Sequence, residues 1–298
     1  MRVSFLGLGS IGRPMARHLA AGPFDLTVWN RTAATAAAFA RETGARHAAT
    51  PADAARDADV VITCLPRSRE VEMLLDGPSG LLRGLRAGAT LVDCTSGDPA
   101  SSVRIAVRLA GQGVGFMDAP VSGGVSGAEQ GTLTVMCGGD ETTLARIRLV
   151  LDAFAARVVP CGAVGTGHAV KAVNNALLAV HLWSTAEGLA ALTKAGVDPA
   201  VALDVVNVSS GRSNASQNLF PERVLTRAFP RTFRLALLDK DVGIAAAFVR
   251  DGRIPAPLLQ LTAELLSIAH RELGDEADHV ELVKVVEGWA GVEIKGDA

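Results

Sequence analysis

The sequence predicts an N-terminal α/β domain with a doubly wound parallel sheet, a long helix, and an all-helical C-terminal domain. Three observations support this fold class. From residue 1 to about 160, short apolar runs alternate with Ala- and Arg-rich helical stretches, as in a parallel sheet wrapped by helices. Residues 166–195 then run for about eight helical turns without proline. No strand-like run follows that helix. The predicted domains are therefore 1–162 and 163–298.

Six apolar runs are the strand candidates of the first domain. Each has about the length of a strand that is buried on both faces, and Gly, Pro or Asp bounds it. They cover residues 3–9, 26–30, 59–66, 90–96, 114–120 and 133–139. In the second domain, amphipathic patterns predict helices over residues 199–207, 218–229, 232–250, 255–273 and 276–290.

The composition limits the class of partner. The 298 residues include 29 Lys and Arg against 31 Asp and Glu, a formal net charge of -2, and 49% are hydrophobic. This balance argues against the broad cationic surface that nucleic acids or anionic membranes require, so the expected partners are small molecules or further copies of the chain. We expect no nucleic acid and no membrane as partner.

The cysteines and the N-terminus predict a cytoplasmic protein. The four cysteines lie far apart without a CxxC pair, which favours reduced thiols over a zinc ribbon or a disulfide framework. The six histidines show no ligand spacing, so no metal is expected. The sequence starts without a signal-peptide pattern, and no uninterrupted apolar run reaches the roughly 18 residues of a membrane span.

A glycine-rich turn directly after the first predicted strand is the candidate dinucleotide site. In such a turn the first glycine allows the tight bend, the second lets the backbone approach a pyrophosphate, and the third lets helix pack on strand. The helix N-terminus adds free N–H donors. The motif consists of Gly7, Leu8, Gly9, Ser10, Ile11 and Gly12. The alternative is a glycine turn without a ligand.

The end of the second predicted strand favours NADP over NAD. An acidic residue normally binds the ribose 2′-hydroxyl of NAD at this place. Here Asn30, Arg31 and Thr32 stand there instead. Arg31 can pair with a 2′-phosphate, and its two neighbours can donate hydrogen bonds. The alternative is an arginine that is merely solvated.

Two further loops follow strand candidates and are expected in the same crevice. Leu65, Pro66 and Thr95 could lie near the nicotinamide ribose, although they are also ordinary strand-ending residues. The loop Ser122-Gly123-Gly124 could direct consecutive N–H groups at a carboxylate, with the serine hydroxyl as another donor. Its alternative is a simple chain reversal.

Lys171 is the candidate acid/base. Only five of the 29 basic residues are lysines, which shows a bias toward arginine. A lysine that is present despite this bias suggests a chemical role. Ala and Val neighbours predict a partly desolvated ammonium with a lowered pKa, as a proton shuttle requires. Asn175, four residues later on the same face, could hold the substrate oxygen. Lys240, at a predicted helix start, could reach the cofactor or the acid. The alternative for Lys171 is a lysine that extends from a helix edge into water.

Four segments together resemble the β-hydroxyacid dehydrogenase family, most closely its bacterial 3-hydroxyisobutyrate dehydrogenases. They cover nearly the whole chain in order: GLGSIGRPMARHLA, DAPVSGGVSGAEQGTL, GAVGTGHAVKAVNN and LLDKDVGIA. The resemblance implies a Rossmann domain, a helical domain of the 6-phosphogluconate dehydrogenase type that pairs with another subunit, and NAD(P)-dependent oxidation of a 3-hydroxy acid to its semialdehyde, as in valine catabolism. It implies Lys171 as the catalytic residue. Substrate binding is implied for Ser122, Gly123, Gly124 and Asn175, and Lys240 would face both cofactor and substrate.

The leading hypothesis is an NADP-preferring 3-hydroxyisobutyrate dehydrogenase, with NAD as the alternative cofactor. The alternatives are a tartronate or succinic semialdehyde reductase of the same family, and a non-catalytic NADPH-binding protein. Residues 175–192 form an almost wholly apolar helix that other helices must cover, which predicts a homodimer or homotetramer.

Overall fold

The computed structural model describes residues 1–296 and contains two compact units. The first unit is Met1–Lys171, and the second begins at Ala172. The division falls inside the long helix α8 (Thr166–Lys194), nine residues after the predicted boundary at 162. The predicted long helix over 166–195 is confirmed.

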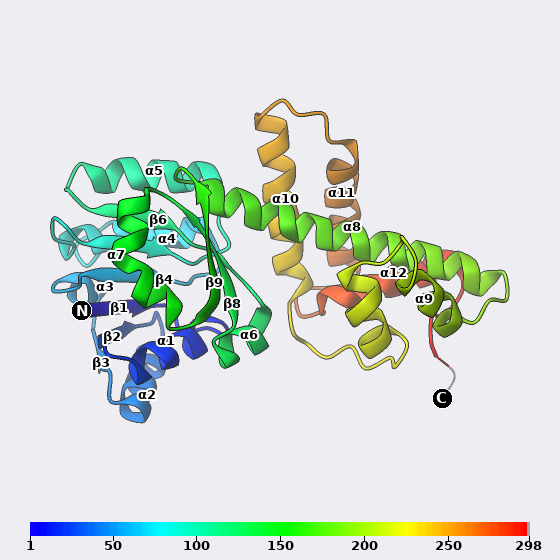
Figure 1. The fold of residues 1–298 in the computed structure, drawn as a ribbon, viewed down its shortest axis with the longest axis horizontal. Coiled ribbons are helices and arrows are strands. Elements are labelled where there is room, and N and C mark those ends of the chain that lie inside the picture. Colours follow the sequence, from blue (N-terminus) through cyan, green and yellow to red (C-terminus); the bar gives the residue numbers. More distant parts are fainter. Residues whose placement is uncertain (297–298) are drawn as a thin grey trace. The chain divides into compact units, whose positions relative to one another are not determined.

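A nine-stranded sheet forms the centre of the first unit (Figure 1). The strand order is β3-β2-β1-β4-β5-β6-β8-β7, and β9 pairs with β8. The six strands from β1 to β6 are parallel, and their order 3-2-1-4-5-6 is that of a dinucleotide-binding sheet. Their bounds are β1 Arg2–Leu6, β2 Asp25–Trp29, β3 Arg46–His47, β4 Val60–Thr63, β5 Thr90–Asp93 and β6 Gly115–Asp118. The predicted fold class is confirmed.

The far side of the sheet departs from a purely parallel arrangement. β8 (Leu133–Gly138) runs antiparallel to both β6 and β7 (Val121–Ser122), whereas β9 (Ala155–Gly162) runs parallel to β8. The strand search missed β3, β7 and β9. Two of these have only two residues each, and only two of the eight residues of the edge strand β9 are buried. A search for continuous apolar runs does not detect such a strand.

Helices cover both faces of the sheet, so alternate strand residues enter two different cores. Val3 and Phe5 of β1 belong to one buried cluster, and Leu6 belongs to the other. This alternation is the consequence of side chains pointing to opposite faces of a strand. The helices of this unit are α1 Gly12–Ala21, α2 Ala33–Thr43, α3 Pro51–Ala55, α4 Ser68–Leu75, η1 Leu81–Arg83, α5 Pro99–Ala110, α6 Gly124–Gln130 and α7 Glu141–Asp152.

The second unit is helical, as predicted, but two of the predicted helices differ in kind. Residues 218–229 were expected to form one helix; instead Ala215–Val224 (η2) is a π-helix with Pro221 inside it. Proline removes a backbone donor and disfavours regular α-helical bonding there. The helix expected over 276–290 begins only after Asp278, which caps it. The elements are α9 Pro199–Asn207, α10 Leu235–Asp251, α11 Pro257–Leu273, η3 His279–Leu282 and α12 Val283–Ala290.

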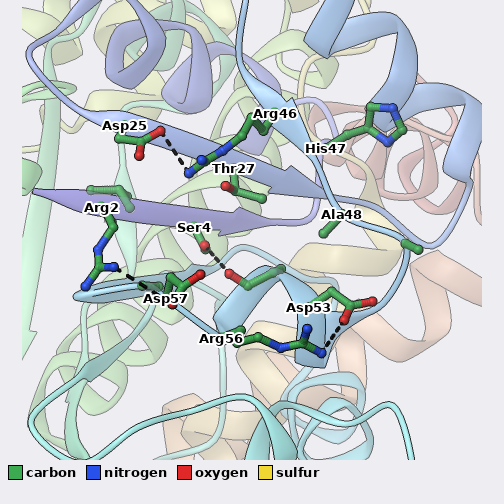
Figure 2. A pocket seen from close by; sticks show the side chains of 14 residues that line it. Arg2, Ser4, Asp25, Thr27, Arg46, His47, Ala48, Asp53, Arg56 and Asp57 are labelled. Carbon is green, nitrogen blue, oxygen red and sulfur yellow. Dashed lines mark hydrogen bonds and ion pairs between the residues drawn. The ribbon is translucent and has the colours of Figure 1, made fainter.

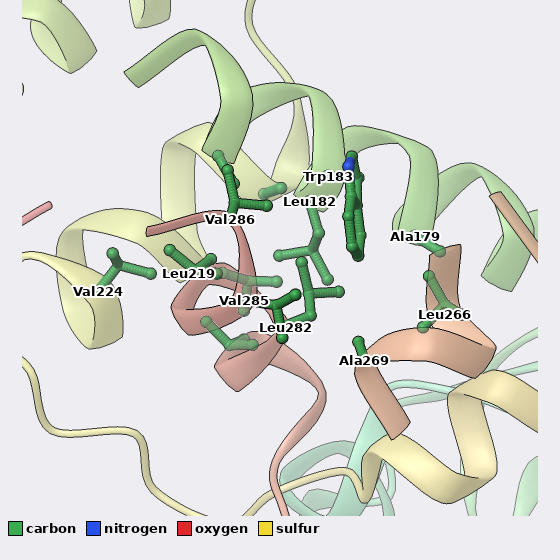
Figure 3. Close-up of a cluster of buried hydrophobic side chains, with 14 of the residues drawn as sticks. Ala179, Leu182, Trp183, Leu219, Val224, Leu266, Ala269, Leu282, Val285 and Val286 are labelled. Carbon is green, nitrogen blue, oxygen red and sulfur yellow. The ribbon is translucent and has the colours of Figure 1, made fainter. Parts of the chain in front are cut away.

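The core of the second unit forms around α8 (Figure 3). Small residues on α8, such as Ala179 and Ala186, let the neighbouring helices approach, and Trp183 packs against Trp289 with ring centroids 5.7 Å apart. Within the described residues, α8 is the one helix long and apolar enough to cross a membrane, with a mean hydropathy of 1.2. Core helices of soluble proteins share that composition, and a buried stripe of α8 lies in this core.

Candidate active site

The glycine-rich turn after β1 has three glycines in three different environments. A Cβ on Gly7, whose φ is +105°, would lie 2.3 Å from the Cys64 carbonyl oxygen. A Cβ on Gly12 would lie 2.0 Å from the Gly7 carbonyl oxygen, so both positions exclude any side chain. A Cβ on Gly9 would meet nothing within 4 Å. Gly9 is thus the exposed point where a phosphate can reach the backbone, and the turn fits a dinucleotide.

Asn30 ties this turn to the end of β2. Its side-chain oxygen accepts a hydrogen bond from the Leu8 N–H at 3.0 Å, and its amide donates to the Thr32 carbonyl at 3.2 Å. Arg31 and Thr32 are exposed beside it, and the first turn of α1 has no acidic residue. The local surface is therefore compatible with a phosphate group.

Thr95 and Leu65 are bonded to each other at the ends of β5 and β4. The Leu65 N–H donates to Thr95 Oγ1 at 3.1 Å. Asp93, the last residue of β5, accepts from the Thr95 N–H at 3.1 Å and from Thr63 Oγ1 at 2.8 Å. Thr95 is only 1% exposed, so its hydroxyl fixes the Leu65 backbone from within the protein. Pro66, the next residue, is exposed.

The predicted substrate loop begins where β7 ends. Ser122 is partly buried, whereas Gly123 and Gly124 are exposed and have φ values of +132° and +65°. Two successive positive φ values require glycine, because other residues adopt them only with strain. The pairing of β6 and β7 with β8 keeps this loop at the carboxyl edge of the parallel strands.

A buried carboxylate joins that edge to the start of α8. Asp118, the last residue of β6, accepts from the Gly165 N–H at 2.6 Å through Oδ1 and from the His168 N–H at 2.8 Å through Oδ2. Burial raises the pKa of Asp118, and His168 and the two N–H groups oppose that rise. Lys171 follows on the next turn of α8 and is partly buried.

A second polar group lies within the helical unit. The Asn175 amide donates to Asp241 Oδ2 at 2.6 Å, and Lys240 Nζ lies 2.9 Å from Asp241 Oδ1. Asp241 therefore joins the two predicted substrate contacts, Asn175 and Lys240. Asn175 and Asp241 are both less than 5% exposed.

A separate hollow of about 420 Å³ lies at the amino ends of β1 and β2, beside α3 (Figure 2). Its charged side chains are paired with one another, including Arg46 with Asp25 at 2.9 Å and Arg56 with Asp53 at 2.7 Å. It contains none of the predicted site residues. Ligands of open parallel sheets bind at the carboxyl ends of the strands, so this hollow is not the candidate site.

Sequence reasoning missed Asp118, His168 and Asp241. Asp118 and Asp241 lie inside the segments DAPVSGG and LLDKDVG, but neither spacing nor neighbours show that they are buried acceptors. The available signal for Asp118 is an acid immediately after a buried strand, which must find a partner. For His168 no local signal exists, because its ring partners lie more than sixty residues away.

The fold and site define a two-unit nucleotide-binding oxidoreductase. Residues 2–163 match the family model described as the NAD-binding domain of 6-phosphogluconate dehydrogenase. Residues 165–286 match that described as NAD-binding of NADP-dependent 3-hydroxyisobutyrate dehydrogenase. The chain belongs to the β-hydroxyacid dehydrogenase family of NAD(P)-dependent oxidoreductases.

The similarity to three relatives covers most of the chain. The chain is 33% identical to 2-(hydroxymethyl)glutarate dehydrogenase of Eubacterium barkeri, over 99% of this chain and 98% of the relative. It is 35% identical to mitochondrial 3-hydroxyisobutyrate dehydrogenase of Mus musculus, over 88% and 80%. The solved structure of Mycobacterium tuberculosis 3-hydroxyisobutyrate dehydrogenase with L-serine superposes with a TM-score of 0.88 at 30% identity, covering 96% and 98%.

Proposed function

We propose that the chain is an NADP-preferring dehydrogenase that interconverts a 3-hydroxy acid and its semialdehyde, with 3-hydroxyisobutyrate as the leading substrate. The observation that carries this proposal is the position of Lys171 one turn beyond His168, whose N–H is bonded to the end of β6. This is the edge of the sheet that also carries Gly9 and the Ser122 loop. A titratable amine, a dinucleotide turn and a carboxylate-binding loop are the parts that such a reaction needs.

The names of the relatives support a common substrate core. 3-Hydroxyisobutyrate, 2-(hydroxymethyl)glutarate and L-serine all carry a hydroxymethyl group next to a carbon that bears a carboxylate. They differ only in the third substituent, which is a methyl, a carboxyethyl or an ammonium group. The shared groups therefore require one site for the carboxylate and one for the hydroxyl, whereas the residues that face the third substituent select the substrate.

Each group of site residues has its own role in the proposed reaction. The turn from Gly7 to Gly12 would hold the pyrophosphate of NADP, and the nicotinamide of that cofactor would accept the hydride. Lys171 in its neutral form takes the hydroxyl proton as the C–H bond breaks, and its ammonium returns that proton in the reverse direction. The N–H groups of Gly123 and Gly124, with the Ser122 hydroxyl, hold the carboxylate. Asn175 orients the hydroxyl from one turn further along α8.

The preference for NADP rests on Arg31. The guanidinium is exposed at the end of β2, and no carboxylate stands at the positions of Asn30 to Thr32 to repel a 2′-phosphate. Since the Asn30 side chain is bonded to the backbone of the glycine turn, its contribution is chiefly to hold that turn in place.

A spectrophotometric panel tests the proposal. It pairs 3-hydroxyisobutyrate, 2-(hydroxymethyl)glutarate, serine, glycerate and 4-hydroxybutyrate with NADP⁺ and with NAD⁺. Turnover only with glycerate or 4-hydroxybutyrate would favour a tartronate or succinic semialdehyde reductase instead. No turnover with any acid, despite tight NADPH binding, would support a non-catalytic binding protein.

Lys171→Ala tests the acid/base role. We expect turnover to fall by at least about 100-fold while NADPH binding is kept, since general acid/base catalysis contributes about 10²–10⁴-fold. Lys194→Ala is the matched control, because Lys194 lies at the other end of α8 and donates to the Ala290 carbonyl. Full activity of Lys171→Ala would remove the lysine from the mechanism.

We also propose that the chain is a cytoplasmic homo-oligomer. The four cysteines are free, as in a reducing compartment. On α9, Val201 and Val205 are more than half exposed, and Val208 directly after it is 86% exposed. Such a row of apolar side chains favours burial against another copy. Light scattering that gave a monomer at micromolar concentration would contradict this assembly.

A further inference from the structure

We propose that Asp118 and His168 are positioning residues that fix the first turn of α8, and with it Lys171, on the carboxyl edge of the sheet. The inference rests on the proposed acid/base role of Lys171. Neither residue is placed to touch the substrate, because both are fully buried. Their effect would pass through the helix that carries the lysine.

Asp118 serves as an N-terminal cap for α8 that comes from a distant strand. The first N–H groups of a helix have no partner within it, and a side chain just before the helix usually accepts from them. Gly165 stands at that place and has no side chain. The two carboxylate oxygens of Asp118 instead accept from the N–H groups of Gly165 and His168. The negative charge also complements the positive end of the helix dipole.

Two glycines leave the space that this carboxylate needs. A Cβ on Gly138 would lie 2.5 Å from Asp118 Oδ1. A Cβ on Gly167 would lie 2.8 Å from Asp118 Oδ2 and 2.3 Å from the Met136 carbonyl oxygen. The start of α8 therefore packs directly on β6 and β8, and a shift of this turn would require backbone to move.

His168 adds two bonds to other elements. Its Nε2 lies 2.7 Å from the Thr95 carbonyl oxygen, which only accepts, so Nε2 carries the proton. Its Nδ1 lies 2.7 Å from the Ser102 hydroxyl on α5. Both ring nitrogens are thus bonded within the protein, so His168 is not placed to bond a substrate. It links the first turn of α8 to the end of β5 and to α5.

Because Lys171 lies on the same helix, these hydrogen bonds also limit where Lys171 can lie. The lysine follows His168 by three residues, so about one helical turn separates its Cα from the anchored His168 N–H. A misplacement of about 1 Å in a reacting group can cost about 100-fold in rate. Loss of one anchor should therefore lower kcat through geometry, while the glycine turn that binds the cofactor is unchanged.

Three variants and one control test this inference in the full-length protein. Asp118→Asn keeps the shape but replaces one acceptor oxygen with a donor. His168→Leu removes both ring bonds, and His168→Gln can restore one of them. Asp198→Asn is the matched control, since Asp198 accepts from two N–H groups at the start of α9 in the other unit.

The readouts separate positioning from folding. For each folded variant we measure NADPH affinity and stoichiometry, kcat, KM, the pH profile of kcat, and the primary isotope effect with 4-deuterated NADPH. We expect kcat to fall 10- to 100-fold in Asp118→Asn and His168→Leu, with the cofactor dissociation constant within twofold. The isotope effect on kcat should rise and the pH profile should shift, because hydride and proton transfer become slower. His168→Gln should fall between His168→Leu and the wild type, and Asp198→Asn should match the wild type.

Each outcome decides the matter. Unchanged kcat in His168→Leu overturns the inference, even where Asp118→Asn fails to fold. A loss of activity that only mirrors a loss of NADPH stoichiometry, with an unshifted pH profile, also overturns it and indicates a merely structural role. If Lys171→Ala is inactive while these variants are not, only this inference fails. If Lys171→Ala retains turnover, the proposed function of the lysine fails, and the inference fails with it.

Discussion

Substitution of Gly9 by alanine should separate cofactor binding from folding. A Cβ at this position meets no atom within 4 Å, so the folded chain accepts the methyl group without a clash. The loss of backbone freedom in the unfolded chain then stabilises the protein by about 0.4–1 kcal/mol. The same methyl group stands where the pyrophosphate must approach the backbone.

The expected loss of affinity follows from the contact that is prevented. A hydrogen bond between an N–H group and a charged phosphate contributes about 1.5–3 kcal/mol. Since each 1.4 kcal/mol is about tenfold in affinity, Gly9→Ala should weaken NADPH binding about 10- to 150-fold. Gly12→Ala would behave differently, because its Cβ falls 2.0 Å from the Gly7 carbonyl oxygen and must disturb the fold as well.

Fluorescence titration with NADPH and urea unfolding without cofactor measure the two effects independently. Gly188→Ala in α8 is the control, since its Cβ also meets nothing within 4 Å. It should gain about 1 kcal/mol of stability from helix propensity and keep the wild-type affinity. Unchanged NADPH affinity in Gly9→Ala would refute the assignment of this turn to the pyrophosphate.

Three other predictions concern the cofactor and pH. Arg31→Asp should lower the kcat/KM ratio of NADP⁺ to NAD⁺ at least about tenfold, because a carboxylate repels the 2′-phosphate; an unchanged ratio would mean that another group binds it. Burial raises the pKa of Asp278, but hydrogen bonds and the charge of His279 together hold it well below its usual 3.8. The ionised Asp278 therefore adds to the free energy of unfolding above pH 3.8, and this stabilisation disappears as the pH falls through the folded-state pKa. In urea unfolding, Asp278→Asn should lower the free energy of unfolding by about 2 kcal/mol at pH 7 and progressively less in acid. The hydrogen bond to Asp239 raises the pKa of His270 above 6.5. The stabilisation of the fold by protonated His270 is therefore complete below pH 6.5 and is lost as the pH rises through the folded-state pKa. His270→Gln should therefore destabilise the protein more at pH 6 than at pH 9, and an equal loss at both would contradict the ion pair.

The cysteines illustrate how burial alters chemistry that the sequence leaves open. Burial raises the pKa of Cys64 and of Cys137 to about 12, and it raises that of Cys94 as well. Thiols in this state are poor nucleophiles at neutral pH. The absence of a CxxC pair indicated that these residues form no metal or disulfide motif, but only their surroundings make them unreactive.

The parts of the fold with a local cause could be predicted from the sequence. The six buried strands, the glycine turn and α8 each depend on the residues of one short segment, through hydrophobic period, backbone freedom or helix length. β9 and the π-helix at Ala215–Val224 could not be predicted in this way, because pairing with β8 and packing around Pro221 decide their conformation.

In the candidate site, too, some features depend on local sequence and others on the tertiary structure. Local sequence predicted the dinucleotide turn and nominated Lys171 among the five lysines, and the role of that lysine stays a prediction. Only the tertiary structure shows that Asp118 caps α8, that His168 bonds to Thr95, and that Asp241 joins Asn175 to Lys240. Hydrogen bonds of this kind join residues tens of positions apart, and a buried polar group takes whichever partner the folded chain brings within reach. A sequence can show that such a group needs a partner, and the tertiary fold decides which partner it has.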